Sequence, residues 1–219
     1  MKKLVLSLLL ACSLSHGYSY SALAYLTPEK TLAMNPFFYT DLGGFVGTSL
    51  FAGYGMTAKT DIWMTMSLFN DGSNFFSTMA RYGLNGSNVL ALAASPLWVS
   101  PQYHFIWEND RVALQSNVAV QLSYDYMDRP AFFAVLSPVL KLVKGIDVFV
   151  EANPGYYLQD GDFANLWYRP EGFGLDFIGG IGFSVGQCIF SVACPVYDVT
   201  NDPTPTAGFW FYYTINSSK

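Results

Sequence analysis

Apolar and polar residues alternate along much of the chain. The alternation is clearest over 61–69, where one face carries Ile62, Met64, Met66 and Leu68 and the other carries polar residues and a tryptophan. The same pattern recurs over 111–125, 146–156 and 175–185. A period of two is typical of a β-strand with two different surroundings, because successive side chains point to opposite faces. The pattern therefore predicts an all-β protein.

The expected strands and the lengths of their connections suggest a barrel. Strands are predicted over 42–56, 60–69, 75–83, 88–95, 101–108, 111–124, 131–143, 146–158, 174–185, 188–198 and 206–215. A further strand within 25–40 would make twelve, an even number as in bacterial barrels. Without the weakest strand, 75–83, and that N-terminal strand, the count is ten. The connections alternate between short and longer, so we expect short turns and both termini at one rim and long loops at the other.

Composition places this barrel in a membrane. Hydrophobic residues make up 52% of the chain and charged residues only 12%, against roughly 25% charged in an average soluble domain. After the N-terminus no run of ~18 apolar residues could form a spanning helix. A closed antiparallel transmembrane β-barrel satisfies its backbone internally and presents an apolar outside. The small residues of the polar face, such as Gly, Ala, Ser, Asn and Gln, suit an enclosed interior. A soluble barrel or sandwich is the alternative.

The N-terminus is typical of an export signal. Lys2 and Lys3 precede an apolar stretch over 4–14, and Ala22-Leu23-Ala24 is a small-x-small cleavage site. We therefore expect a signal peptide over 1–24 and a single barrel domain over 25–219. A second processing route, acylation of Cys12, is open because Leu9–Cys12 loosely resembles a lipoprotein signal. Without Lys2 and Lys3, 9 basic residues face 16 acidic ones, a net charge of −7, and the chain has no basic patch that would bind nucleic acid.

Two short motifs resemble those of known membrane barrels. Tyr54–Thr57, followed by Asp61, is similar to a strand-turn-strand motif of such proteins. The alternating aromatics of 208–215 resemble the C-terminal strand that the barrel-assembly machinery recognises, although the chain ends on Lys219 and not on an aromatic residue. The sequence thus resembles small Gram-negative outer-membrane porin-like and transporter-like barrels. The resemblance implies a bacterial outer-membrane location, with the lipid bilayer and the assembly machinery as partners.

Residues for catalysis or metal binding are sparse. His104 is the histidine outside the export signal, and it shares the polar face with Gln102. No serine spacing around it matches a lipid hydrolase, so we expect no enzyme, with a lipid-modifying enzyme that uses His104 as a distant alternative. Asp160-Gly161-Asp162 is interpreted as a solvated loop, and no cofactor or metal is expected.

The polar face predicts a solute path. Its members are Asp61, Arg111, Gln115, Asn117, Gln121, Lys141, Asp147, Glu151, Asn153 and Asp176. They predict a channel for passive diffusion of small hydrophilic solutes, neutral or weakly cation-favouring because acids are in excess, with the long loops gating the outer mouth. Arg111 or Lys141 could instead pair with Asp147 or Glu151 and brace a closed interior. A non-conducting barrel that binds a partner through Gln159–Phe173 is the second interpretation.

Overall fold

The computed structural model of the protein describes residues 25–41, 44–70, 72, 74–124, 129–158, 161–162, 168–169, 171–185, 188–198 and 208–216. Within these ranges the longer strands are β1 (Thr31–Asp41), β2 (Gly44–Thr57), β3 (Thr60–Phe69), β4 (Asn74–Asn85), β5 (Asn88–Ala94), β6 (Trp98–Glu108), β7 (Val112–Ser123), β8 (Ala131–Val143), β9 (Ile146–Tyr157), β12 (Gly172–Val185), β13 (Cys188–Asp198) and β14 (Gly208–Asn216). Two short strands, β10 (Gly161–Asp162) and β11 (Tyr168–Arg169), pair with each other.

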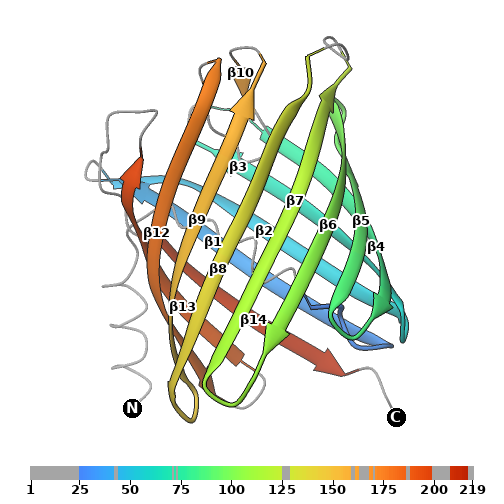
Figure 1. Cartoon of the computed structure of the whole chain (residues 1–219), viewed down its shortest axis with the longest axis vertical. Coiled ribbons are helices and arrows are strands. Elements are labelled where there is room, and N and C mark those ends of the chain that lie inside the picture. Colours follow the sequence, from blue (N-terminus) through green and yellow to red (C-terminus); the bar gives the residue numbers. More distant parts are fainter. Residues whose placement is uncertain are drawn as a thin grey trace.

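The longer strands form one antiparallel sheet that curves into a barrel (Figure 1). Each strand pairs with its neighbour in the chain, β12 follows β9, and β1 lies between β14 and β2. Thr31 pairs with Asn216 and Leu32 with Tyr54. The start of β1 and the end of β14 therefore lie at the rim of the short β2–β3 turn, as expected. The predicted all-β, antiparallel class is confirmed.

Strand positions agree closely with the alternation, and three differences are informative. The weak pattern over 75–83 belongs to β4, which is longer than predicted. β6 begins at Trp98, three residues before the predicted 101: the pairing with β7 is interrupted at Ser100 and Pro101, but the pairing with β5 continues through both. The expected loop Gln159–Phe173 contains the β10–β11 pair, and β12 begins within it at Gly172.

Local side-chain hydrogen bonds explain where the turns fall. Asn109 Oδ1 accepts hydrogen bonds from the backbone N–H groups of Arg111 (2.8 Å) and Val112 (2.9 Å), which reverses the chain between β6 and β7. Gly145 has φ 82° in the turn between β8 and β9, a conformation that glycine adopts without a steric cost. The tight turns thus follow from polar residues and glycine between the alternating segments.

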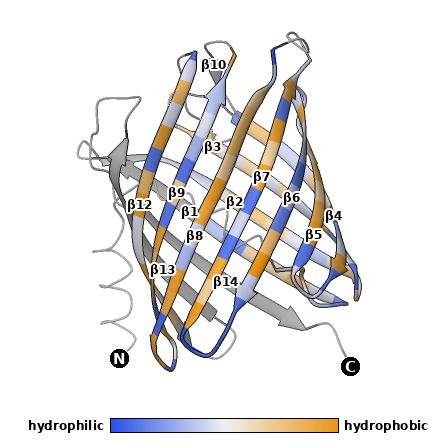
Figure 2. Cartoon of the chain, in the orientation of Figure 1, coloured by the Kyte–Doolittle hydropathy of each residue, from blue (hydrophilic) through white to orange (hydrophobic). Residues whose placement is uncertain are grey.

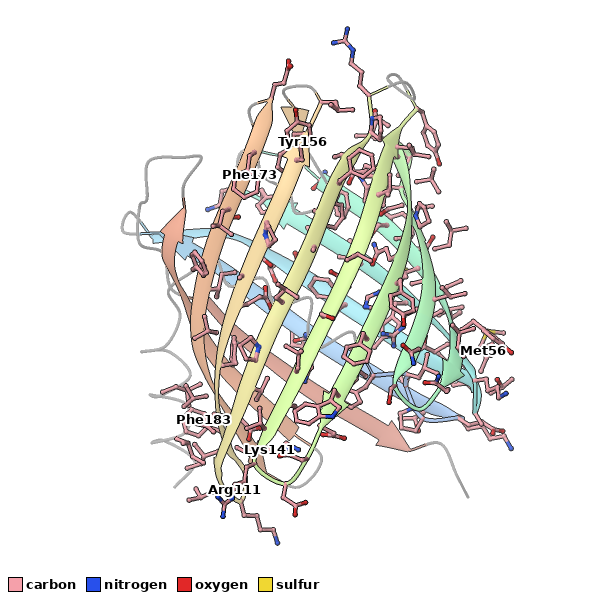
Figure 3. The ribbon with its side chains drawn as sticks, in the orientation of Figure 1. Met56, Arg111, Lys141, Tyr156, Phe173 and Phe183 are labelled. Carbon is pink, nitrogen blue, oxygen red and sulfur yellow. The ribbon has the colours of Figure 1, made fainter. Side chains whose placement is uncertain are left out.

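The two faces of the sheet differ as the alternation predicted. Outward side chains are large and apolar, and Met56, Val118 and Phe173 are 54%, 54% and 63% exposed. Figure 2 shows apolar and polar residues alternating along the strands, and Figure 3 shows Met56, Tyr156, Phe173 and Phe183 on the outline of the barrel. Many inward side chains are small and polar: Ser49, Ser67, Ser100 and Ser137 are all buried. The alternation also predicts Leu42, Val46, Cys188 and Cys194 on the outer face and Gly43 and Phe45 on the inner face, and these side chains lie outside the described part.

Candidate functional site in the barrel interior

A polar wall lines the inner side of β6, β7, β8 and β9. His104 of β6 pairs in register with Asn117 of β7, and both are buried. One step toward the short-turn rim, Gln115 of β7 pairs with Ser137 of β8. Glu151 of β9 is fully buried and lies one strand beyond Ser137 in the same register. These inward positions form one continuous surface because neighbouring strands keep the same parity.

Several polar atoms of this wall have no hydrogen-bond partner in the protein. They include both side-chain polar atoms of Asn117, together with His104 Nε2, Gln102 Oε1 and Ser137 Oγ. Buried polar groups in native proteins are almost always satisfied by protein or by water. A row of unsatisfied amides, a hydroxyl and an imidazole therefore suits contact with enclosed water or with a hydrated solute.

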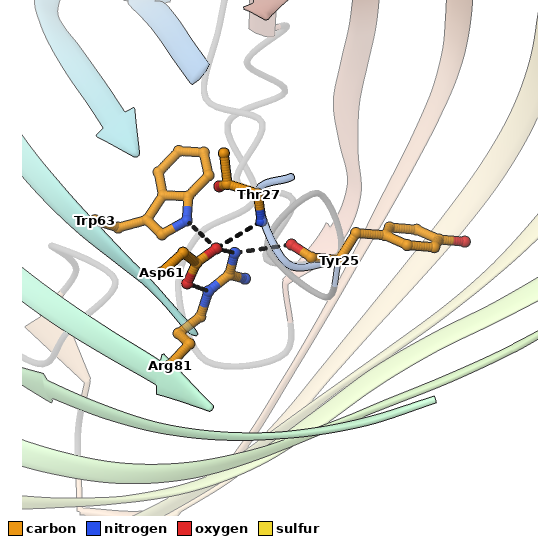
Figure 4. A network of polar contacts seen from close by, with 5 residues as sticks. All are labelled: Tyr25, Thr27, Asp61, Trp63 and Arg81. Atoms are coloured by element: carbon orange, nitrogen blue, oxygen red, sulfur yellow. Dashed lines mark hydrogen bonds and ion pairs between the residues drawn. The ribbon is translucent and has the colours of Figure 1, made fainter. Parts of the chain in front are cut away.

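An ion pair between β3 and β4 lies beside this wall, because only β5 separates β4 from β6. Asp61 and Arg81 pair in register, and both side chains are fully buried. Arg81 Nε donates to Asp61 Oδ1 at 2.8 Å, and Nη2 donates to Oδ2. Trp63 Nε1 also donates to Oδ2 at 3.2 Å, and its ring centroid lies 5.4 Å from the guanidinium carbon of Arg81 (Figure 4). The carboxylate and the guanidinium are thus compensated within the protein, as a buried ion pair requires.

The residues that precede β1 complete this ion-pair cluster. The backbone N–H of Thr27 donates to Asp61 Oδ2 at 2.6 Å, and Arg81 Nη2 donates to the carbonyl oxygen of Tyr25 at 2.8 Å. Figure 4 shows both residues beside the ion pair, on a segment that is not part of a strand. The segment Tyr25–Lys30 therefore folds back against the inner wall near the short-turn rim.

An apolar cluster occupies another part of the interior. Phe51, Trp63, Phe149 and Ile178 are buried together with Ala33, and Met79, Phe69 and Val139 pack against them. These side chains come from strands on opposite parts of the ring, which narrows the space available to solutes.

The predicted path residues divide into three groups. Asp61, Asn117, Gln121 and Glu151 are buried on the inner face. Gln115, Asp147, Asn153 and Asp176 are half-buried on the same face. Lys141 and Arg111 lie at the short-turn rim (Figure 3), and Arg111 is exposed in the turn that precedes β7.

Lys141 lies opposite Asp147 in the register of β8 and β9, one of the pairings that the sequence left open, and its ion pair is formed with another carboxylate. Lys141 Nζ contacts Glu108 Oε2 at 3.0 Å and the carbonyl oxygen of Asn109 at 2.9 Å. Glu108 ends β6, two strands away from β8, and sequence spacing alone did not suggest it as a partner for Lys141. Arg111 belongs to the rim because the Asn109 turn ends one residue after it.

Arg81 is the member of the buried ion pair that the sequence analysis does not assign. It lies in the strand with the weakest alternation, so its face was not assigned. Arg81 lies two residues before Gly83, so the two share one face of a strand that pairs with 60–69. The register that brings Arg81 opposite Asp61 is set only in the folded sheet.

His104 has an aliphatic residue and an amide as its cross-strand neighbours, Val89 and Asn117. In the described part of the chain, no three His, Cys, Asp or Glu residues group as a metal site would require. No helix among the described residues is long and apolar enough to cross a membrane.

An antiparallel barrel with an apolar outside and a partly polar inside has the architecture of porin-like β-barrels. No protein-family model matches the sequence, and no curated protein does. Among solved structures the chain is similar to a NanC porin, with a TM-score of 0.60 at 8% identity over 85% of this chain and 100% of that one. It is also similar to an outer-membrane channel from Pseudomonas putida F1, with a TM-score of 0.54 at 8% identity over 88% and 98% of the two chains. At this identity the likeness concerns the fold.

Proposed function

We propose that the protein is a narrow channel of the bacterial outer membrane, a closed barrel of twelve strands through which small hydrophilic solutes diffuse passively. The observation that carries the proposal is the inner wall around His104, Asn117 and Ser137, whose buried polar atoms lack protein partners. Such a wall can replace part of the hydration of a passing solute. The fold shared with a porin and an outer-membrane channel supports this role, and the proposal assigns no catalysis to His104.

The outer face suits the bilayer as a partner. Side chains such as Leu92 and Val118, at the middle of β5 and β7, are about half exposed although they are aliphatic. Acyl chains would cover them in a membrane, as in other transmembrane barrels. We further propose that residues 1–24 are the export signal and that β14 is the strand by which the assembly machinery recognises the barrel.

The charges of the inner face favour cations. Where side chains are described, the inward carboxylates are Asp61, Glu108, Asp147, Glu151 and Asp176, and the inward cations of the strands are Arg81 and Lys141. An excess of carboxylates along a narrow path attracts cations and repels anions. We therefore propose a path for neutral and weakly cationic solutes.

Recordings from the purified protein in planar bilayers test this proposal. We expect discrete conductance steps and, across a KCl gradient, a reversal potential that favours K⁺ over Cl⁻. Glu151→Gln should move this potential toward zero, whereas Val150→Ala, one residue away on the outer face, should leave it unchanged. Absence of steps, or a preference for Cl⁻, would contradict the channel or its selectivity.

A non-conducting barrel is the second candidate. The apolar cluster of Phe51, Trp63, Phe149 and Ile178 favours it, because such side chains exclude water from the part of the interior that they fill. In that case the barrel would brace the membrane or bind an extracellular partner through Gln159–Phe173. The same bilayer recordings separate the two candidates.

A further inference from the structure

The six residues before β1, Tyr25–Lys30, form an N-terminal strap that crosses the inner side of several strands. At the end of the strap next to β1, the backbone N–H of Lys30 donates to the carbonyl oxygen of Gly55 on β2 at 2.7 Å. Farther along, the contacts with Asp61 and Arg81 hold it to β3 and β4. At its far end, the hydroxyl of Tyr25 donates to Glu108 Oε2 at 3.1 Å, at the end of β6. The strap thus reaches from β2 to β6 at the short-turn rim.

Two inward glycines make room for the strap. A Cβ atom at Gly55 would lie 2.0 Å from the carbonyl oxygen of Pro28, and one at Gly83 would lie 2.7 Å from Leu26 Cδ1. Both distances are far below van der Waals contact, so any other residue at Gly55 would have to displace the strap backbone. Gly55 is therefore a position that only glycine allows beneath the docked strap, whereas a Cβ at Gly83 would require the Leu26 side chain to move.

A cavity lies beside the strap at the rim. It has a volume of about 300 Å³ and is lined by Tyr25 and Leu26 together with the rim residues Lys59, Val89 and Ile106. Burial, followed by the charge of Glu108, raises the pKa of Tyr25 to about 12, and the charge of Asp147 on β9 adds to this shift. Glu108 Oε2 also accepts a hydrogen bond from Lys141 Nζ of β8 at 3.0 Å, so the end of the strap is joined to the rim where β6 and β8 meet, and the strap lies across the inner side of this mouth.

We infer that the N-terminal strap, held by the Asp61–Arg81 pair, is an internal plug that limits flow at the short-turn mouth. This inference rests on the proposed channel function, and it places the constriction at the rim opposite to the long loops. Cleavage of the export signal after Ala24 would make Tyr25 a free end, so the strap could leave the interior without breaking any strand.

Displacing the strap without altering the outer face tests the inference. In Gly55→Val the new side chain collides with Pro28, whereas the control Ala52→Val changes the outward face of the same strand. We expect Gly55→Val, and deletion of residues 25–29, to raise single-channel conductance at least about twofold, because they clear one mouth. Ala52→Val should conduct like the wild type.

A disulfide tests the position of the strap independently of conductance. In a background with Cys188→Ala and Cys194→Ala, Leu26→Cys and Gly83→Cys should form a disulfide on mild oxidation, because Leu26 already contacts the position of a Gly83 side chain. Conductance should stay low in the oxidised protein. Failure of the disulfide to form in folded protein would overturn the docking of the strap.

The remaining outcomes distinguish this inference from the proposed function. If the disulfide forms but deletion of 25–29 leaves conductance at the wild-type value, the strap is not the constriction. If the wild type is silent and the deletion conducts, the strap closes the barrel fully and the proposal of an open pore fails while the inference stands. If both are silent, the channel function fails and the inference fails with it.

Discussion

Replacing Arg81 by methionine removes a buried charge and leaves its partner in place. Methionine keeps a similar length of apolar side chain but cannot donate to Asp61 or to the carbonyl oxygen of Tyr25. The carboxylate of Asp61 would then keep two donors, Trp63 Nε1 at 3.2 Å and the backbone N–H of Thr27 at 2.6 Å. It would remain a buried anion without a compensating cation.

The burial of the pair sets the expected cost. Both side chains are fully buried, so solvent does not screen the loss as it would at the surface. Removing one partner of a buried ion pair typically costs about 3–5 kcal/mol. In Asp61→Leu/Arg81→Met no charge is left, and the loss reduces to the hydrogen bonds to Tyr25, Thr27 and Trp63, about 1 kcal/mol each. The double variant should therefore be more stable than Arg81→Met alone.

Equilibrium urea unfolding in detergent micelles or lipid vesicles measures these differences. Tryptophan fluorescence and gel mobility of the unheated protein report the folded barrel, and comparable m-values would justify the comparison. A loss below about 1 kcal/mol for Arg81→Met would mean that the pair is as well hydrated as an exposed salt bridge. A double variant less stable than the single one would also refute this reasoning.

Three further predictions address the two faces, the interior packing and the strap. Val118→Lys, on the outer face of β7, should lower the free energy of unfolding in vesicles by about 2–4 kcal/mol, whereas Asn117→Asp on the inner face should chiefly increase cation preference; equal losses of stability would contradict the assignment of the faces. Gly53→Ala should lower the melting temperature, because its Cβ would lie 2.3 Å from the Trp63 ring, with a cost of about 1–3 kcal/mol; an unchanged melting temperature would show that the ring is free to move. The pKa of Tyr25 is raised to about 12, so its contribution to stability should be complete below pH about 10 and lost as pH rises toward 12. The difference in phenolate absorbance between wild type and Tyr25→Phe measures this pKa. A titration near pH 10 would place Tyr25 in solvent.

Much of the fold could be predicted because the governing pattern is local. Ile62 and Asp61 point to opposite faces whatever the rest of the chain does, since neighbouring side chains of a strand always do so. Polar residues and glycine at Asn109 and Gly145 likewise end strands through bonds and backbone angles within a few residues. The buried positions of Asn117, Gln121 and Glu151 follow from parity alone.

The candidate site was predicted only in part, because its pairs depend on register and on closure. Asp61 meets Arg81 across 20 residues, and Lys141 meets Glu108 across 33. A slip of one residue between strands would turn either partner to the other face. The interior apolar cluster could not be predicted for a similar reason: the alternation places Phe51, Trp63 and Phe149 on the inner face of their strands, but their contact depends on the curvature of the sheet.

Local alternation alone predicts strands with two different faces. The large apolar side chains of one face require contact with lipid, and the small polar side chains of the other require an enclosed interior. This prediction is possible because successive side chains of a strand point to opposite faces, which depends only on neighbouring residues. The residues that occupy the enclosed space are known only from the folded barrel. The clearest case is the hydrogen bond from Tyr25 to Glu108, which joins residues 83 positions apart. The physical reason is that the partners of a folded-back segment are chosen by the shape and charge of a surface that does not exist until the strands have paired.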